Sequence, residues 1–229
     1  MLNELHKSNK FQETIFLAMF SFFCLGISVF RFVYTDTKTF LFLNWNLFLS
    51  FVPWALSSLL IIYPHLQKNK LLTLIVLGAW LLFFPNAPYI LTDLFHLRLK
   101  SSVPKWFDLM LILSFAWTGL LFGMLSLSDI ERILSRNIRP FWATTICVFI
   151  LFLASFGVYL GRFLRWNSWD IIQKPYALLS DIADRFLNPF AHPKAWGITI
   201  LMGIFLNMVY WSLKLIQKRS NIKVTTSPL

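Results

Sequence analysis

The stretch from Phe83 to Leu97, FFPNAPYILTDLFHL, places ionisable side chains at the end of an apolar run. Tyr89, Asp93 and His96 stand at positions i, i+4 and i+7, so a helix would carry them on one face. A carboxylate beside an imidazole can serve as an acid, a base or a metal ligand. The alternative is a satisfied interfacial pair that only holds a loop in place.

Asp108 follows in the segment WFDLM, at the start of the next apolar run. A carboxylate in a first helical turn complements the positive end of the helix dipole, which would be a structural role. It would also reach Asp93 and His96 if both segments end at the same membrane face. We therefore take Asp93, His96 and Asp108 as the candidate catalytic residues.

A second polar group lies in the segment GRFLRWNSWD, where two arginines alternate with aromatic residues. Guanidinium groups bind phosphate and carboxylate through paired donors, and lipid headgroups are rich in phosphate. The candidate binding residues for a lipid headgroup or a phosphate are Asn86, Tyr89, Arg162, Arg165, Trp166 and Asp170. The alternative is that the arginines neutralise Asp93 and Asp108 while the tryptophans mark the membrane interface.

The composition indicates that a bilayer surrounds these segments. Of the 229 residues, 57% are hydrophobic and only 14% are charged, which a water-soluble domain cannot accommodate. About 20 apolar residues cross the roughly 30 Å of bilayer hydrocarbon. We predict a single all-α membrane domain over residues 1–229, a polytopic helix bundle with about six spans. The expected spans are Thr14–Tyr34, Leu41–Tyr63, Leu71–Phe84 with a broken segment 85–97, Trp106–Leu127, Pro140–Gly161 and Gly197–Ile216.

The third span is predicted to break at Pro85. The run Leu71–Phe84 would reach only about 21 Å as a helix, short of the hydrocarbon thickness. Pro85 lacks an N–H and clashes with the preceding turn, so the helix should end or bend there. Irregular backbone at membrane depth is tolerated only against protein or a water-filled cavity. We expect Asn86 to bond the freed backbone groups from inside the bundle.

Six spans put the loops after spans one, three and five on one face. The two polar motifs, Asn86–His96 and Arg162–Asp170, would then lie together, along with Arg31, a cation expected to extend toward the headgroups. The charges of SDIERILSRNIR would lie on the opposite face, and we interpret them as an ordinary solvated segment. The basic C-terminal tail favours cytoplasmic N- and C-termini.

Two G-x-x-x-G spacings occur, at Gly119 and Gly123 and at Gly157 and Gly161. Such pairs let another backbone approach a membrane helix closely. We expect the two pairs not to meet each other, and we expect the second pair to admit the broken third span.

The segment between Pro175 and Pro189 is amphipathic and too short to span a bilayer. Its leucines and isoleucine share one face, whereas its aspartates and arginine share the other. It is predicted to be a helix that lies on the membrane or roofs the bundle mouth, with a plain connector as the alternative.

Several classes of site have no sequence support. The chain has no metalloprotease, nucleophile-elbow or phosphate-loop motif, so we expect no metal and no cofactor. Cys24 and Cys147 lie inside apolar runs and are interpreted as buried hydrophobes. The formal charge of +11 is spread over loops and span ends, which favours a lipid bilayer over nucleic acid as the partner.

The segments PNAPYILTDLFHL, WFDL with SFAWTGLLFG, and GRFLRWNSWD carry a family resemblance. Together they resemble a family of bacterial integral membrane proteins recorded only as a domain of unknown function. The resemblance runs from about the second span to the sixth. It implies a multi-span membrane protein and brings no activity, substrate or catalytic residue.

Three classes of function remain open, and whether the chain is an enzyme is one of the open points. The first is an accessory or structural membrane protein whose polar cluster locks helices together. The others are a membrane enzyme acting on a lipid-linked or headgroup substrate, and a small permease. Its oligomeric state is likewise open. We predict that Asp93, His96 and Asp108 converge with Arg162 or Arg165 in one pocket under the Pro175–Pro189 segment.

Overall fold

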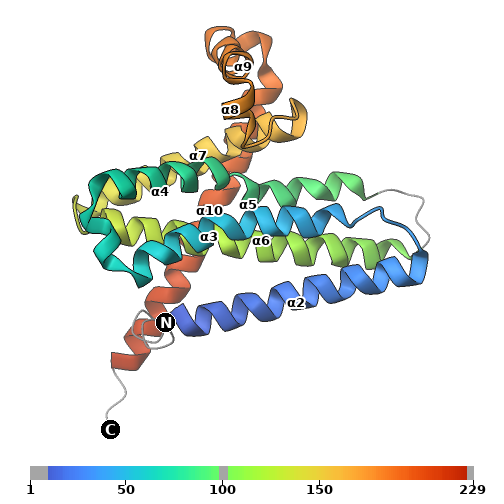
Figure 1. The fold of residues 1–229 in the computed structure, drawn as a ribbon, viewed down its shortest axis with the longest axis horizontal. Helices are drawn as coiled ribbons and strands as arrows, with labels where there is room; N and C mark the ends of the chain where they lie inside the picture. Colours follow the sequence, from blue (N-terminus) through green and yellow to red (C-terminus); the bar gives the residue numbers. More distant parts are fainter. Residues whose placement is uncertain (1–9, 98–102, 226–229) are drawn as a thin grey trace.

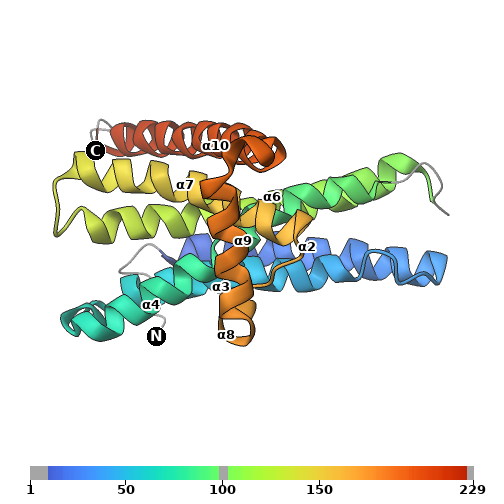
Figure 2. The same cartoon turned by 90° about the horizontal axis from the view of Figure 1, so that it is seen from above.

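The structure is a computed structural model that describes residues 10–97 and 103–225, with side chains as far as Gln217. In this part of the chain, six helices are long and apolar enough to cross a membrane. Five of them are continuous: α2 (Lys10–Thr35), α3 (Phe42–Ile62), α6 (Lys105–Leu134), α7 (Pro140–Phe163) and α10 (Pro193–Thr225). Helices α2, α3 and α6 run side by side along the long axis of the molecule, whereas α10 crosses this direction obliquely (Figures 1 and 2). The predicted all-helical bundle with six apolar spans is confirmed.

The remaining span is interrupted, as predicted. Helix α4 (Lys70–Phe83) is followed by the short helix α5 (Asn86–Tyr89) and the 3-10 helix η2 (Ile90–His96). The backbone stays in the right-handed helical region through Phe84 and Pro85, so the interruption changes the helix type rather than starting a loop. Asn86 Nδ2 donates to the Phe83 carbonyl at 2.9 Å, an acceptor that the interruption frees because the Ala87 N–H bonds the Phe84 carbonyl instead.

Helix α6 is the centre of the bundle. It packs against α2, α3, α5, α7 and η2, and 67% of its apolar window is buried inside the protein. The same windows of α2 and α10 are only 22% buried, so these two helices lie at the periphery. One apolar core forms between α6 and the α4, α7 and α10 helices, and a second between α6 and the α2 and α3 helices.

The glycine pairs of α6 and α7 enclose the interruption of the third span. A Cβ atom at Gly119 of α6 would lie 2.7 Å from Ile90 Cδ1, and one at Gly157 of α7 would lie 2.8 Å from Pro85 Cγ. Gly123 and Gly161 likewise face Ala87 and Tyr89. The expectation that α7 admits the broken span is confirmed, and the α6 pair admits it from the other side. Both pairs therefore contact the same segment rather than each other.

The segment between α7 and α10 forms α8 (Asp170–Gln173), α9 (Pro175–Leu187) and the short η3 (Pro189–Ala191), and η1 (Pro64–Lys68) connects α3 to α4. Figure 2 shows α9 running crosswise to the long helices. Leu179 and Leu187 of α9 are exposed, as are Ile172 of α8 and Phe190 of η3. The predicted helix is present, and its contact with the membrane stays a prediction.

We expect Gly157→Ala to lower the free energy of unfolding by about 1–3 kcal/mol, because the new methyl would overlap the Pro85 ring. Gly26→Ala and Gly78→Ala are matched controls, since nothing lies within 4 Å of a Cβ at either position. They should be neutral or stabilise by up to about 1 kcal/mol. Unfolding midpoints in detergent micelles measure all three, and equal effects would contradict the close packing at Pro85.

Candidate polar site at one end of the bundle

Asp93 is the most deeply buried carboxylate of the predicted cluster, with 0% of its surface exposed. Its Oδ2 accepts a hydrogen bond from Asn46 Nδ2 of α3 at 2.8 Å, and its Oδ1 pairs with Arg162 Nη1 of α7 at 3.3 Å. The 3-10 geometry of η2 places His96 three residues on, with its Nδ1 at 3.7 Å from the same Oδ1. Asp93 thus joins η2 to two neighbouring helices at the end of the bundle.

Arg162 binds η2 through several atoms at once. Its Nη2 donates to the Thr92 carbonyl at 2.7 Å and to His96 Nδ1 at 3.0 Å. Its Nη1 also approaches the Tyr89 hydroxyl at 3.5 Å, and the guanidinium lies over the Tyr89 ring. The predicted meeting of Asp93, His96 and an arginine is therefore present in the structure.

These contacts fix the proton of the His96 ring. A guanidinium can only donate, so Nδ1 must accept from Arg162. At 3.7 Å, the Asp93 carboxylate is too distant to draw a proton onto Nδ1. The neutral ring accordingly carries its proton on Nε2, and its second nitrogen is a hydrogen-bond donor.

A polar cavity of about 540 Å³ adjoins this cluster. Its lining residues are Tyr89, Phe95, His96, Gly161, Arg162, Arg165 and Asn167. This volume lies within the range of small-molecule sites, roughly 300–1,000 Å³. Arg165 is exposed, and among the described residues no carboxylate or carbonyl pairs with it. The cavity therefore contains a cation that none of the described residues neutralises.

The backbone at Arg165 is held in the left-handed region, with φ at 61°. Helix α7 ends at Phe163, and the Trp166 N–H returns to the Leu160 carbonyl at 3.1 Å, which closes the helix end. Glycine is the usual residue in that conformation, and a side chain there costs roughly 1–2 kcal/mol. The sequence places an arginine in a strained position beside the cavity, a pattern typical of functional sites.

Asp108 and Arg31 depart from the sequence prediction. Asp108 Oδ1 pairs with Arg31 Nε at 2.6 Å, so Arg31 supplies the cation that we expected from Arg162 or Arg165. Arg31 is only 4% exposed and also donates to Thr37 Oγ1, so the prediction that it extends to the headgroups is wrong. The physical reason is that a buried carboxylate next to α2 neutralises it inside the bundle.

The other predicted binding residues, Asn86, Trp166 and Asp170, are not among the residues that line the cavity. Asn86 Nδ2 also donates to Ser168 Oγ at 3.2 Å, which ties the third span to the loop after α7. Trp166 Nε1 donates to Asp181 of α9 at 2.7 Å, so α9 is anchored beside the cavity. Asp170 Oδ2 accepts from the Asn167 N–H at 2.7 Å rather than from an arginine. These three residues position loops, whereas the arginines and His96 line the cavity.

The polar face of α9 carries ion pairs of its own, and no residue of this helix is among those that line the cavity. Arg185 pairs with Asp181 at 3.1 Å, and His192 Nε2 lies 2.7 Å from Asp184 Oδ2. Hydrogen bonds from Asn188 and His192 hold the pKa of Asp184 below its usual range, which keeps this exposed carboxylate ionised.

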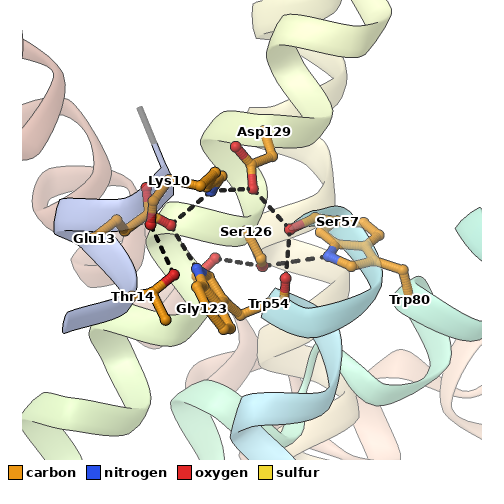
Figure 3. A network of polar contacts seen from close by, with 9 residues as sticks. All are labelled: Lys10, Glu13, Thr14, Trp54, Ser57, Trp80, Gly123, Ser126 and Asp129. Atoms are coloured by element: carbon orange, nitrogen blue, oxygen red, sulfur yellow. Dashed lines mark hydrogen bonds and ion pairs between the residues drawn. The ribbon is translucent and has the colours of Figure 1, made fainter. Parts of the chain in front are cut away.

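The other end of the bundle contains a buried charge network that the sequence analysis missed (Figure 3). Lys10 Nζ lies 2.6 Å from both Glu13 Oε1 and Asp129 Oδ2, and Ser57 Oγ donates to Asp129 at 2.9 Å. Trp54 Nε1 donates to Glu13. Lys10 is only 3% exposed, so the network joins α2, α3 and α6 inside the protein.

The interpretation of SDIERILSRNIR as solvated is wrong at its first half. Asp129 and Glu131 are both buried, because cations from the two peripheral helices cover them. Lys214 of α10 lies 2.6 Å from Glu131, which also accepts from Tyr210 and Thr144. The sequence did contain a signal of this burial, because two carboxylates stand two residues apart at the end of an apolar run. Across the described residues, no three His, Cys, Asp or Glu side chains gather as they would around a metal ion.

A family model described as "Protein of unknown function (DUF1361)" matches residues 45–209, more than half of the chain. The chain belongs to this family. The match begins inside α3, includes α4 to α9 and about half of α10, and contains the Asp93–Arg162 pair and the cavity. No curated protein matches the chain, and no solved structure matches it.

We expect Asp93→Asn to destabilise the protein by about 1–3 kcal/mol, because it removes the charge from a buried acceptor and leaves the half-buried guanidinium of Arg162 without its counter-ion. Asp36→Asn is the matched control, since Asp36 is exposed and its left-handed backbone suits asparagine. The double variant Asp93→Asn/Arg162→Gln should lose less than the sum of its single variants. Additive losses in denaturant unfolding would show that the two side chains are not coupled.

Proposed function

We propose that this multi-pass membrane protein binds an anionic, phosphate-bearing group in the cavity beside Asp93, at the level of the lipid headgroups. The observation that carries the proposal is Arg165, a cation in a strained backbone position that lines the cavity with no anionic partner among the described residues. A bound phosphate would supply the partner.

The cavity presents donors to a ligand. Arg165 brings a guanidinium group that has no partner among the described residues, and Arg162 and His96 line the same cavity. Phosphate oxygens are acceptors, and arginine binds them through paired donors of matching geometry. The residues that line the cavity suit an anion better than a cation or a neutral sugar, because no carboxylate is among them.

The depth of the cavity supports a headgroup or a headgroup-sized ligand. His96 is the last residue of the third span, and Arg162 lies one residue before the end of α7. Span ends lie at the membrane–water interface, where lipid phosphates are found. We propose that the protein lies in a bacterial inner membrane with cytoplasmic termini, which would put this cavity on the opposite, outer face.

A structural lock is the second candidate, and the contacts of Arg162 favour it. That guanidinium bonds Asp93, the Thr92 carbonyl and His96, all in η2. The two candidate functions are assigned to different residues of the same segment. Arg162 holds η2 on α7, and Arg165 contacts the ligand. The candidate catalytic residues support binding more than reaction, since Asp93 is buried behind Arg162 and Asp108 is paired with Arg31.

We expect Arg165→Asn to weaken phosphate binding by roughly tenfold to a hundredfold, the loss of one or two charge-assisted hydrogen bonds. Asparagine tolerates the left-handed backbone, so stability should be unchanged or higher. Lys174→Gln is the control, because Lys174 is exposed, lies beside α9 and is not a lining residue.

Two assays on the purified full chain separate the sources of phosphate. Calorimetry with inorganic phosphate tests a free anion, and native mass spectrometry with phosphatidylglycerol tests a headgroup. Retention of phosphatidylglycerol that inorganic phosphate displaces indicates a headgroup, whereas binding of phosphate alone indicates a soluble ligand. Equal binding by wild type and Arg165→Asn in both assays would refute the proposal.

A further inference from the structure

Five exposed cations gather at the end of the bundle opposite the polar cavity. They come from η1, the start of α4, the end of α6 and the connection between α6 and α7. We call them the basic patch: Lys68, Lys70, Arg132, Arg136 and Arg139. Arg136 Nη1 lies 3.5 Å from Gln67 Oε1 of η1, so the two connections that carry the patch lie beside each other.

The patch has no counter-charge among the described residues. The described carboxylates at this end of the bundle are Glu13, Asp129 and Glu131. Lys10 lies 2.6 Å from the first two (Figure 3), and Lys214 lies 2.6 Å from Glu131. Because cations of α2 and α10 bind these carboxylates, none of the three forms an ion pair with a cation of the patch.

Two cations of the patch stand where the fold itself does not favour them. Lys70 is the first residue of α4, and Arg139 is the N-cap residue of α7. A helix N-terminus carries a partial positive charge, so a cation there is unfavourable. Neither helix has a carboxylate in its first turn to offset that cation. The two charges therefore oppose the stability of their helices, whereas an anion outside the protein would be attracted by them.

The patch lies at the level of the lipid headgroups. Lys70 begins the third span, and Arg139 directly precedes the fifth. Phe141 and Trp142, in the first turn of α7, are exposed on the surface of that span, and tryptophan is enriched at the membrane–water interface. The connections before both spans are short, so they keep the cations close to the span ends. Phosphates of bilayer lipids are therefore the anions that lie at the same depth.

We propose that the basic patch binds the headgroups of anionic phospholipids in the leaflet at this end of the bundle. The charge of the patch is complementary to such headgroups, and each cation near an anionic surface strengthens the attraction about fivefold. In the proposed orientation this leaflet is the cytoplasmic one. The patch shares no residue with the phosphate cavity at the other end.

Native mass spectrometry of the full chain tests this proposal. The protein carries Arg165→Asn, which removes the cation proposed to bind phosphate in the cavity. It is purified in micelles with equal amounts of phosphatidylglycerol and phosphatidylcholine that have the same acyl chains. We expect it to retain phosphatidylglycerol preferentially.

Adding Lys70→Gln/Arg139→Gln should lower the ratio of retained phosphatidylglycerol to phosphatidylcholine about tenfold, because two cations leave the patch. The same change should leave the unfolding midpoint unchanged or raise it, since both charges oppose a helix dipole. The matched control is Lys38→Gln/Lys174→Gln, which removes the same charge from exposed positions at the other end of the bundle. It should leave the ratio unchanged, because the exposed Asp36 stands two residues from Lys38 and the Lys174 side chain lies outside the patch.

The proposal is overturned if the starting protein shows no preference for phosphatidylglycerol, or if Lys70→Gln/Arg139→Gln retains that preference. Equal losses in the two double variants would also overturn it, because net charge alone would then set the preference. Retention of a duplex DNA oligonucleotide in place of phosphatidylglycerol, lost with Lys70→Gln/Arg139→Gln, would assign the patch to nucleic acid instead. Every sample lacks the Arg165 guanidinium, so these outcomes are separate from the test of the phosphate cavity.

Discussion

A carboxylate buried among apolar helices needs a cation inside the bundle, and this need organises the end of the protein where Asp93 lies. Asp93 has no exposed surface, so its charge must be balanced by Arg162 and its second oxygen by Asn46. Arg162 can reach it only because η2 passes close to α7. The interruption at Pro85 and the small residues at Gly157 and Gly161 provide that approach.

The same constraint recurs along α6, which carries three further buried carboxylates. Asp108 is paired with Arg31 of α2, Asp129 with Lys10 of α2, and Glu131 with Lys214 of α10. Apolar packing alone discriminates poorly between helix neighbours in lipid, since lipid tails are as apolar as leucine. The ion pairs therefore fix the position of the two peripheral helices, which bury little of their own surface.

The sequence predicted the features that depend on local rules. Six apolar runs, the effect of Pro85 on its helix and the close packing of Gly157 each follow from the residues themselves, and the structure has all three. Which cation meets which carboxylate was not predictable, because it depends on helix neighbours that sequence spacing does not give. Asp108 was expected to meet Arg162 or Arg165, yet α2 brings Arg31 to it. The segment SDIER was similarly interpreted as solvated, because the sequence does not show that Lys10 and Lys214 lie beside its carboxylates.

The central claim is that Arg165 and Arg162 line a site for a phosphate-like anion, and anomalous diffraction tests it most directly. Crystals of the full chain grown in a lipidic mesophase would be soaked in tungstate, a heavy analogue of phosphate. The account predicts an anomalous peak inside the cavity, within hydrogen-bond distance of the Arg165 guanidinium. A cavity without a peak, in crystals where tungstate occupies other cationic sites, would contradict it.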